Sequence, residues 1–148
     1  EHVSFGKYYD RKNGFEVIAK GVNTVNDIAP ALDVILDDID FLYTPVDNML
    51  ASSYPVIVKK ANERNKPVIG SVTDYVQQGA LATEGINQYK IGVQTADMII
   101  KYLEGKTKIA DMPFETVKDT DLLINETVAG TLGIKISDEL SKRAKFVK

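Results

Sequence analysis

The residues of this sequence that could bind a ligand stand in polar clusters directly behind apolar runs. Carboxylates accept hydrogen bonds from an ammonium group, and amide or hydroxyl groups can donate to a carboxylate. A glycine lets the backbone approach a ligand closely. Together these residue types suit a small zwitterion such as an amino acid. The candidates for ligand contact are Thr44, Asp47, Asn48, Ser71, Asp74, Gly79 and Ala80.

The acidic and amide candidates also have a purely structural interpretation. Asp47 and Asn48 precede an amphipathic stretch, where such residues are ordinary helix caps worth about 1 kcal/mol. The free N–H groups of that helix start would favour an anionic ligand group. Asp74 could equally belong to a Thr-Asp turn. The sequence leaves both interpretations open.

The tyrosines present a second set of alternatives. Tyr43 and Tyr75 could stack on a ligand, although packing in the core or at its rim is the more ordinary use of such side chains. Tyr54 and Tyr89 are expected to be structural.

Motifs for catalysis are poor in this chain. GSVTD lacks the paired glycines of a nucleophile elbow, and neither GxxxxGK[ST] nor GxGxxG occurs. There is no cysteine, and His2 is the single histidine, which we expect at the surface. The sequon at Asn125 coincides with an expected helix cap. We therefore predict a protein that is not an enzyme and needs neither a cofactor nor a metal.

Composition excludes several further classes. The 148 residues are 44% hydrophobic, enough for a folded core, and the net charge of −3 argues against nucleic acid or an anionic membrane as partner. No apolar run approaches the length of a membrane span. The opening EHVSFGKYYD has no signal-peptide pattern and is typical of the end of a helix. This predicts that an earlier part of the natural protein precedes it.

The candidate ligand-contact residues must be positioned by strands and helices, and the sequence predicts that these two kinds of element alternate along the chain. Short apolar runs predict strands, and apolar residues at helical spacing predict helices. Alternating units of this kind indicate an α/β fold with a doubly wound parallel sheet, in which ligands bind beyond the carboxyl ends of the strands. The expected strands are 15–21, 41–44, 67–72 and 79–83, and the expected helices are 28–36, one carrying 56–61, and 91–103.

Two prolines restrict where helices begin. Pro30 is tolerated only in a first turn, which predicts a helix start near Asn26 or Asp27. Pro55 leaves two possibilities, a helix that begins near Ser53 or an earlier helix kinked at the proline. The C-terminal part predicts strands at FETV (114–117) and LLIN (122–125), a helix from about Glu126 capped by Asn125, and a last helix at DELSKRAKF (138–146).

The order and spacing of several motifs resemble a known family over nearly the whole chain. PVDN, the PV of PVIG, VQQGALAT, YKIGVQTA, LEG and LLIN are similar to the motifs of ABC-transporter substrate-binding proteins of the tryptophan/tyrosine type. The early segment GFEVIAKGVNTVNDIAPAL and the later residues Ala129 and Leu132-Gly133-Ile134 extend the likeness.

The resemblance implies a type I periplasmic-binding-protein fold of two α/β lobes with the ligand between them. On this basis residues 1–88 are the second ligand-binding lobe without its opening strand. Residues 89–112 are a helix expected to cross back to the first lobe, and 113–148 are C-terminal strands and helices. The first lobe is not in this chain, so the helix needs another partner, and a dimer or swapped assembly is one possibility.

The same resemblance implies the solute-binding component of an ABC importer, with an amino acid, possibly tryptophan or tyrosine, as ligand and permease subunits as partners. Asp47 or Asp74 would then hold the ammonium, and Asn48 the carboxylate. The family is exported, extracellular or periplasmic, and often anchored as a lipoprotein. A ligand-sensing regulatory domain of the same fold is the first alternative, and an enzyme on a related scaffold is the second.

Overall fold

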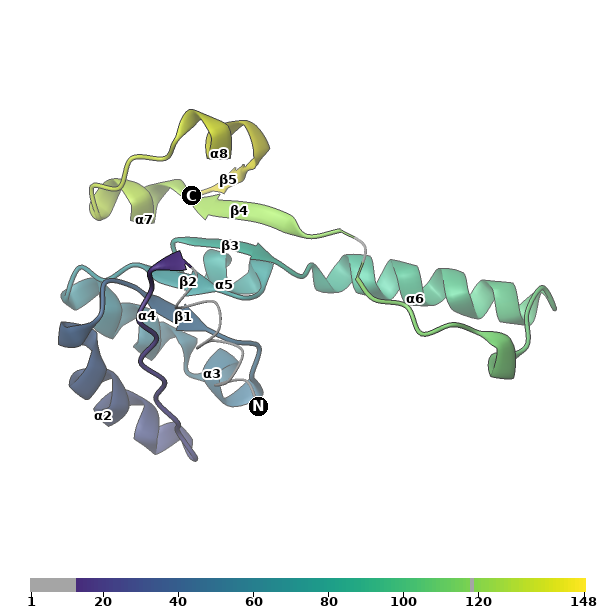
Figure 1. Cartoon of the computed structure of the whole chain (residues 1–148), viewed down its shortest axis with the longest axis horizontal. Coiled ribbons are helices and arrows are strands. Elements are labelled where there is room, and N and C mark those ends of the chain that lie inside the picture. Colours follow the sequence, from purple (N-terminus) through teal and green to yellow (C-terminus); the bar gives the residue numbers. More distant parts are fainter. Residues whose placement is uncertain (1–12, 118) are drawn as a thin grey trace.

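The computed structural model describes residues 13–117 and 119–148. His2 and the expected opening helix end therefore lie outside the described residues. Figure 1 shows a compact α/β body from which one long helix, α6, projects. The elements are α2 (Val25–Ile35), η1 (Leu36–Asp38), β1 (Leu42–Thr44), α3 (Asn48–Ser52), α4 (Tyr54–Glu63), β2 (Val68–Gly70), α5 (Thr73–Gln77), β3 (Ala82–Gly85), α6 (Gln88–Leu103), η2 (Ile109–Asp111), β4 (Asp121–Asn125), α7 (Glu126–Thr131), α8 (Asp138–Arg143) and β5 (Lys145–Val147).

The sheet has the strand order β1-β2-β3-β4-β5. Strands β1, β2 and β3 are parallel, β4 is antiparallel to β3, and β5 is parallel to β4. The expected α/β fold is confirmed, but the sheet is mixed rather than wholly parallel. The reason is topological: the chain leaves the body at the end of β3, runs out along α6 and returns to the same edge, so β4 must run in the opposite direction (Figure 1).

Helices α2 and α4 pack against each other and bury the apolar stripes that their sequences carry. Burial of such side chains is the main favourable term in folding, at about 1.5–3 kcal/mol for each large aliphatic residue. Helix α7 packs against β4 and β5. The main hydrophobic core consists of Ile28, Leu32, Leu36, Tyr54, Ile57, Val58, Ala61, Val68, Val72, Tyr75, Val76, Ala80 and Leu123.

Helix α2 begins earlier than we predicted from the position of Pro30. Asp27 Oδ2 accepts a hydrogen bond of 2.8 Å from the Thr24 backbone N–H, so this carboxylate fixes the start at Val25. Pro30 consequently lies in the second turn, where its missing N–H leaves the Asn26 carbonyl without a helix hydrogen bond.

The region around Pro55 contains two helices. The short α3 ends at Ser52, and α4 begins at Tyr54 with Pro55 in its first turn. This is the first of the two arrangements expected from the sequence, preceded by an extra helical turn. At the other end of the body, Asn125 is confirmed as the cap of α7, since its side chain accepts a hydrogen bond of 2.9 Å from Val128 N.

Two expected elements are wrong, and a third is shorter than expected. Residues 15–21 form no strand, and this segment is largely exposed. Residues 114–117 are also without regular structure, and Phe114 is 94% exposed. An apolar run forms a strand only where a neighbouring strand accepts its hydrogen bonds, and neither segment has one. The last helix stops at Arg143, because Lys145–Val147 pairs with β4 instead.

Gly79 provides a test of the turn that leads into β3. Its φ is +107°, and an added Cβ would lie 2.8 Å from Val58 Cγ1. We expect Gly79→Ala to lower the free energy of unfolding of the full-length protein by about 1–3 kcal/mol, measured by urea denaturation. Gly130→Ala in α7 is the matched control, because its Cβ would meet nothing within 4 Å. It should be neutral or stabilise by up to about 1 kcal/mol; equal losses in the two variants would contradict this account.

Candidate functional site

Five of the seven candidates come together at one edge of the sheet. Because β1 and β2 are parallel, the segments that follow Thr44 and Gly70 leave from the same side, and β3 ends there too. Loop 45–47 and residues 71–72 therefore lie on the same edge of the sheet as the end of β3 at Gly85, with residues 71–72 beside it. The candidates gathered at this carboxyl edge are Thr44, Asp47, Asn48, Ser71 and Asp74.

Gly79 and Ala80 lie elsewhere. They precede β3 and so belong to the opposite edge of the sheet. Ala80 is completely buried, and Gly79 faces Val58 of α4. The structure therefore does not bring this pair to the other five candidates, and its glycine serves a turn.

A stacked tyrosine pair supports the carboxyl edge from inside the core. The rings of Tyr54 and Tyr75 are parallel within 14°, with centroids 4.0 Å apart. The Tyr54 hydroxyl lies 2.9 Å from Thr44 Oγ1, and burial raises the pKa of Tyr54 to about 12. The Tyr75 hydroxyl donates to the carbonyl oxygens of Pro45 and Asp47, at 3.4 and 3.3 Å. The pair thus ties the end of β1 and the loop behind it to the core.

The burial of the four tyrosines differs in part from the prediction. Tyr54 and Tyr75 are core residues, so the packing interpretation of Tyr75 is confirmed. Tyr43 is 59% exposed at the open edge strand. Tyr89, expected to be structural, is 80% exposed on the first turn of α6, so that expectation is wrong.

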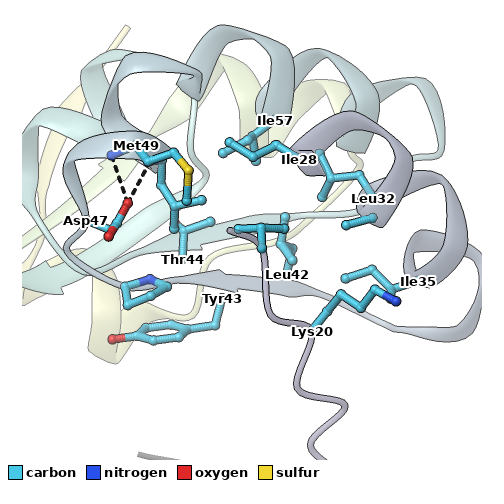
Figure 2. Close-up of a pocket in the computed structure, with 14 residues that line it drawn as sticks. Lys20, Ile28, Leu32, Ile35, Leu42, Tyr43, Thr44, Asp47, Met49 and Ile57 are labelled. Atoms are coloured by element: carbon cyan, nitrogen blue, oxygen red, sulfur yellow. Dashed lines mark hydrogen bonds between the residues drawn. The ribbon is translucent and has the colours of Figure 1, made fainter. Parts of the chain in front are cut away.

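Asp47 is the cap of α3. Its Oδ1 accepts hydrogen bonds from Met49 N at 2.8 Å and Leu50 N at 3.0 Å, as Figure 2 shows. The helix N–H groups that could have held a ligand carboxylate are therefore used by the protein itself. Both bonds end on Oδ1, so Oδ2 takes part in neither, and the residue is exposed.

The remaining edge residues differ in burial. Asn48 opens α3 and Asp74 lies in the first turn of α5, and both are exposed. The hydroxyl of Ser71 is buried and has no hydrogen-bond partner among the described residues. A buried hydroxyl of this kind is normally satisfied by water or a ligand. The edge thus combines two exposed carboxylates, an amide and a hydroxyl available for a further bond.

A groove that the sequence did not indicate adjoins this edge. It has a volume of about 260 Å³ and runs between α2 and β1. In Figure 2, Ile28, Leu32 and Ile57 face Leu42 across it, with Thr44 and Asp47 at one end and Lys20 at the other. A sign of it was present in α2, whose apolar stripe extends to Ile35 although only Ile28, Ala31 and Leu32 of this helix are buried.

A charged cluster at the base of α6 was also missed. Asp121 opens β4 and is only 7% exposed. Its carboxylate accepts hydrogen bonds from Lys90 Nζ at 2.7 Å, Asn87 Nδ2 at 2.9 Å and Lys145 Nζ at 3.2 Å. These bonds, that of Lys90 first, hold the pKa of Asp121 well below its usual range. No local spacing relates residues 87–90 to residue 121, so the sequence carries no direct sign of this cluster.

Metal sites and membrane-spanning helices are two further features to consider in the described part of the chain. There, no group of three or more His, Asp or Glu side chains is arranged to hold a metal. Within the same residues, no helix has the length and apolar character that crossing a bilayer requires.

The structure is an α/β lobe with polar groups along its carboxyl edge. A helix that buries none of its residues projects from this lobe, and the arrangement is that of a substrate-binding domain. The chain belongs to the ABC transporter substrate binding protein family, whose sequence profile matches residues 1–148.

Relatives and solved structures agree with this assignment. The chain is 37% identical over 147 residues to a tyrosine-binding protein of Clostridioides difficile, covering 93% of this chain and 42% of that protein. An uncharacterised protein of Rickettsia prowazekii is 27% identical over 123 residues, 83% of this chain and 40% of that protein. The chain thus spans about two fifths of the length of these relatives.

Two solved structures show the same arrangement of elements. The ABC domain from Streptococcus pneumonia in complex with L-Trp superposes with a TM-score of 0.87 at 34% identity, over 99% of this chain and 50% of that one. The ligand-free, open substrate binding protein with adhesive properties from Clostridium difficile gives a TM-score of 0.75 at 39% identity, over 99% and 48%. These neighbours are periplasmic-binding-protein domains, in accord with a single α/β lobe here.

The Asp121 cluster leads to a prediction about stability and pH. The lowered pKa means that the cluster stabilises the fold fully above the unfolded pKa of about 4 and is lost as pH falls toward the folded pKa. We expect Asp121→Asn to cost about 2 kcal/mol of unfolding free energy at pH 7 and clearly less at pH 3, measured by urea denaturation. The control Asp33→Asn removes the two ion pairs of an exposed carboxylate, with Lys60 and Arg64, and should cost clearly less than Asp121→Asn at pH 7. A loss for Asp121→Asn that does not change with pH would contradict the assignment.

Proposed function

We propose that this chain is a ligand-binding lobe of the solute-binding component of an ABC importer, and that its ligand is an amino acid with an aromatic side chain. The observation that carries the proposal is the carboxyl edge, where Asp47 and Asp74 are both exposed. Ser71 lies at the same edge, and its buried hydroxyl has no hydrogen-bond partner among the described residues. Support for the ligand class comes from two relatives, one described as a tyrosine-binding protein and one as a complex with L-Trp.

Four of the five edge residues contact the ligand in this proposal. The ligand ammonium donates hydrogen bonds either to Oδ2 of Asp47 or to the carboxylate of Asp74. Charge-assisted bonds of this type are about twice as strong as neutral ones. Asn48 and Ser71 donate to the ligand carboxylate, because the Met49 and Leu50 N–H groups are already bonded to Asp47. The candidates without a contact in this scheme are Gly79 and Ala80, which lie at the other edge, and Thr44, whose buried hydroxyl pairs with Tyr54.

The proposal includes a second lobe that closes the site. Helix α6 buries none of its residues and exposes Ile99, Ile100 and Leu103, the last to 74%. Apolar side chains in this number call for a covering surface. We assign that surface to a first lobe, because the solved relatives contain about as much chain again. Residues 1–88 with 113–148 then form one lobe, 89–112 reach the other, and hinge closure traps the ligand.

The remaining parts of the proposal concern place and partners. The protein acts outside the cytoplasmic membrane, held there as a lipoprotein, and presents its closed form to permease subunits. The matched relatives named for a function are binding proteins, which fits a role without catalysis. Among these comparisons nothing favours a dimer or a swapped assembly over the two-lobed arrangement.

Charge-removing substitutions test the ammonium site without removing the helix cap. Asn caps a helix about as well as Asp, so Asp47→Asn keeps the start of α3 while it removes the carboxylate charge. We expect Asp47→Asn or Asp74→Asn to weaken binding of L-Trp or L-Tyr to the full-length protein by about 10- to 100-fold, measured by calorimetry, since a bond to a charged group is worth about 1.5–3 kcal/mol.

The matched control is Asp138→Asn, which removes an exposed carboxylate from the first turn of α8. It should leave the dissociation constant unchanged. Wild-type affinity in both Asp47→Asn and Asp74→Asn would show that these residues are structural caps and turns only. A full-length protein that is folded but binds no amino acid would overturn the ligand class.

A further inference from the structure

The two connections between the body and α6 lie side by side. The chain leaves the sheet after Gly85 and returns at Asp121, and these two residues are register partners in adjacent strands. Figure 1 shows α6 and the returning segment extending together from this point. Any change in the direction of α6 relative to the sheet must therefore be accommodated at this pair of connections.

One carboxylate joins both connections. Asp121 Oδ2 accepts from Asn87, the cap of α6, and Asp121 Oδ1 accepts from Lys90 in the first turn of that helix. Asn87 Oδ1 in turn accepts from Lys90 N at 3.3 Å. Because Asp121 is almost fully buried while it makes these bonds, its charge is held by a small number of fixed donors. The outgoing connection, the helix start and the returning strand are thereby fastened together.

Farther along, α6 is fastened to the returning segment rather than to the sheet. Gln94 Nε2 donates to Glu115 Oε2 at 2.8 Å and to the Thr116 carbonyl at 3.1 Å. Among the described residues, the side-chain hydrogen bonds of α6 go to this segment and to Asp121. Helix and returning segment thus form one arm, and Asp121 is the point at which the arm is fixed to the body.

We propose that Asn87, Lys90 and Asp121 form a hinge clamp that sets the direction in which α6 leaves the sheet. This rests on the proposed function in one respect: if α6 carries a second lobe, the clamp biases the balance of lobe orientations and so the apparent affinity for ligand. None of the three residues lies among the five candidates at the carboxyl edge. They are positioning residues that act through geometry, by favouring one member of a set of orientations.

Lys145 offers a matched control on the same carboxylate. It also bonds to Asp121 Oδ1, but it lies on β5, within the body, and has no link to the arm. Lys90→Met and Lys145→Met therefore each remove one cation from the same oxygen. Only Lys90→Met removes a bond between the body and α6.

The test measures the direction of α6 inside this chain. The 148 residues contain no cysteine, so Lys59→Cys on α4 and Lys101→Cys on α6 introduce two spin labels at exposed positions. The measurement uses the ligand-free full-length protein, with any cysteine outside these residues replaced by Ser. We expect Lys90→Met to broaden or shift the distribution of distances between the two labels, measured by pulsed electron paramagnetic resonance spectroscopy. Lys145→Met should leave the distribution as in the wild type. Unchanged distributions in both variants, or equal changes in both, would overturn the clamp.

A second readout separates the clamp from the ligand proposal. If both hold, Lys90→Met changes the dissociation constant of L-Trp or L-Tyr by about three- to tenfold, and Lys145→Met does not. A changed distance distribution in a protein that binds no amino acid would keep the clamp and reject the ligand class. Normal amino-acid binding together with an unchanged distance distribution in Lys90→Met would keep the ligand class and reject the clamp.

Discussion

The stack of Tyr54 on Tyr75 is the interaction on which the rest of the lobe depends. The two rings fill the core beneath the ends of β1 and β2, and an added Cβ on Gly70 would lie 2.8 Å from Tyr75 Cβ. Only a strand without a side chain at this position admits the pair. Their hydroxyls then reach Thr44 and the carbonyls of Pro45 and Asp47. A buried hydroxyl needs such a partner, so the packing of the core and the placement of the carboxyl edge depend on each other.

A second constraint is the path of the chain through α6. Leaving and re-entering at one edge makes β4 antiparallel and places the start of β4 beside the end of β3. Asp121 is thereby buried among Lys90, Asn87 and Lys145, far from these partners in sequence. The same path carries α6 away from the body, so that none of its residues is buried. The mixed sheet, the charged cluster and the exposed helix share this one topological cause.

Expectations based on local chemistry were confirmed where the responsible contacts are local. The cap at Asn125 and the long amphipathic helix ending at Leu103 depend on residues within a turn or two of one another. The strand expected at 15–21 did not form, because strand formation requires a partner and this segment pairs with no strand of the sheet. Gly79 and Ala80 were assigned to the ligand edge although they precede β3. The expected strand at 79–83 included the turn, whereas β3 begins only at Ala82.

The sequence by itself determined the α/β class, the amphipathic faces and the polar ends of two strands, because side-chain periodicity and cap chemistry act over a few residues. The tertiary structure alone decided which polar groups meet. It placed Asp47, Ser71 and Asp74 on one edge, left the Ser71 hydroxyl without a partner, and joined Asp121 to a helix some thirty residues away. Strand direction and long-range pairing depend on how distant segments share one core, and no local pattern encodes that.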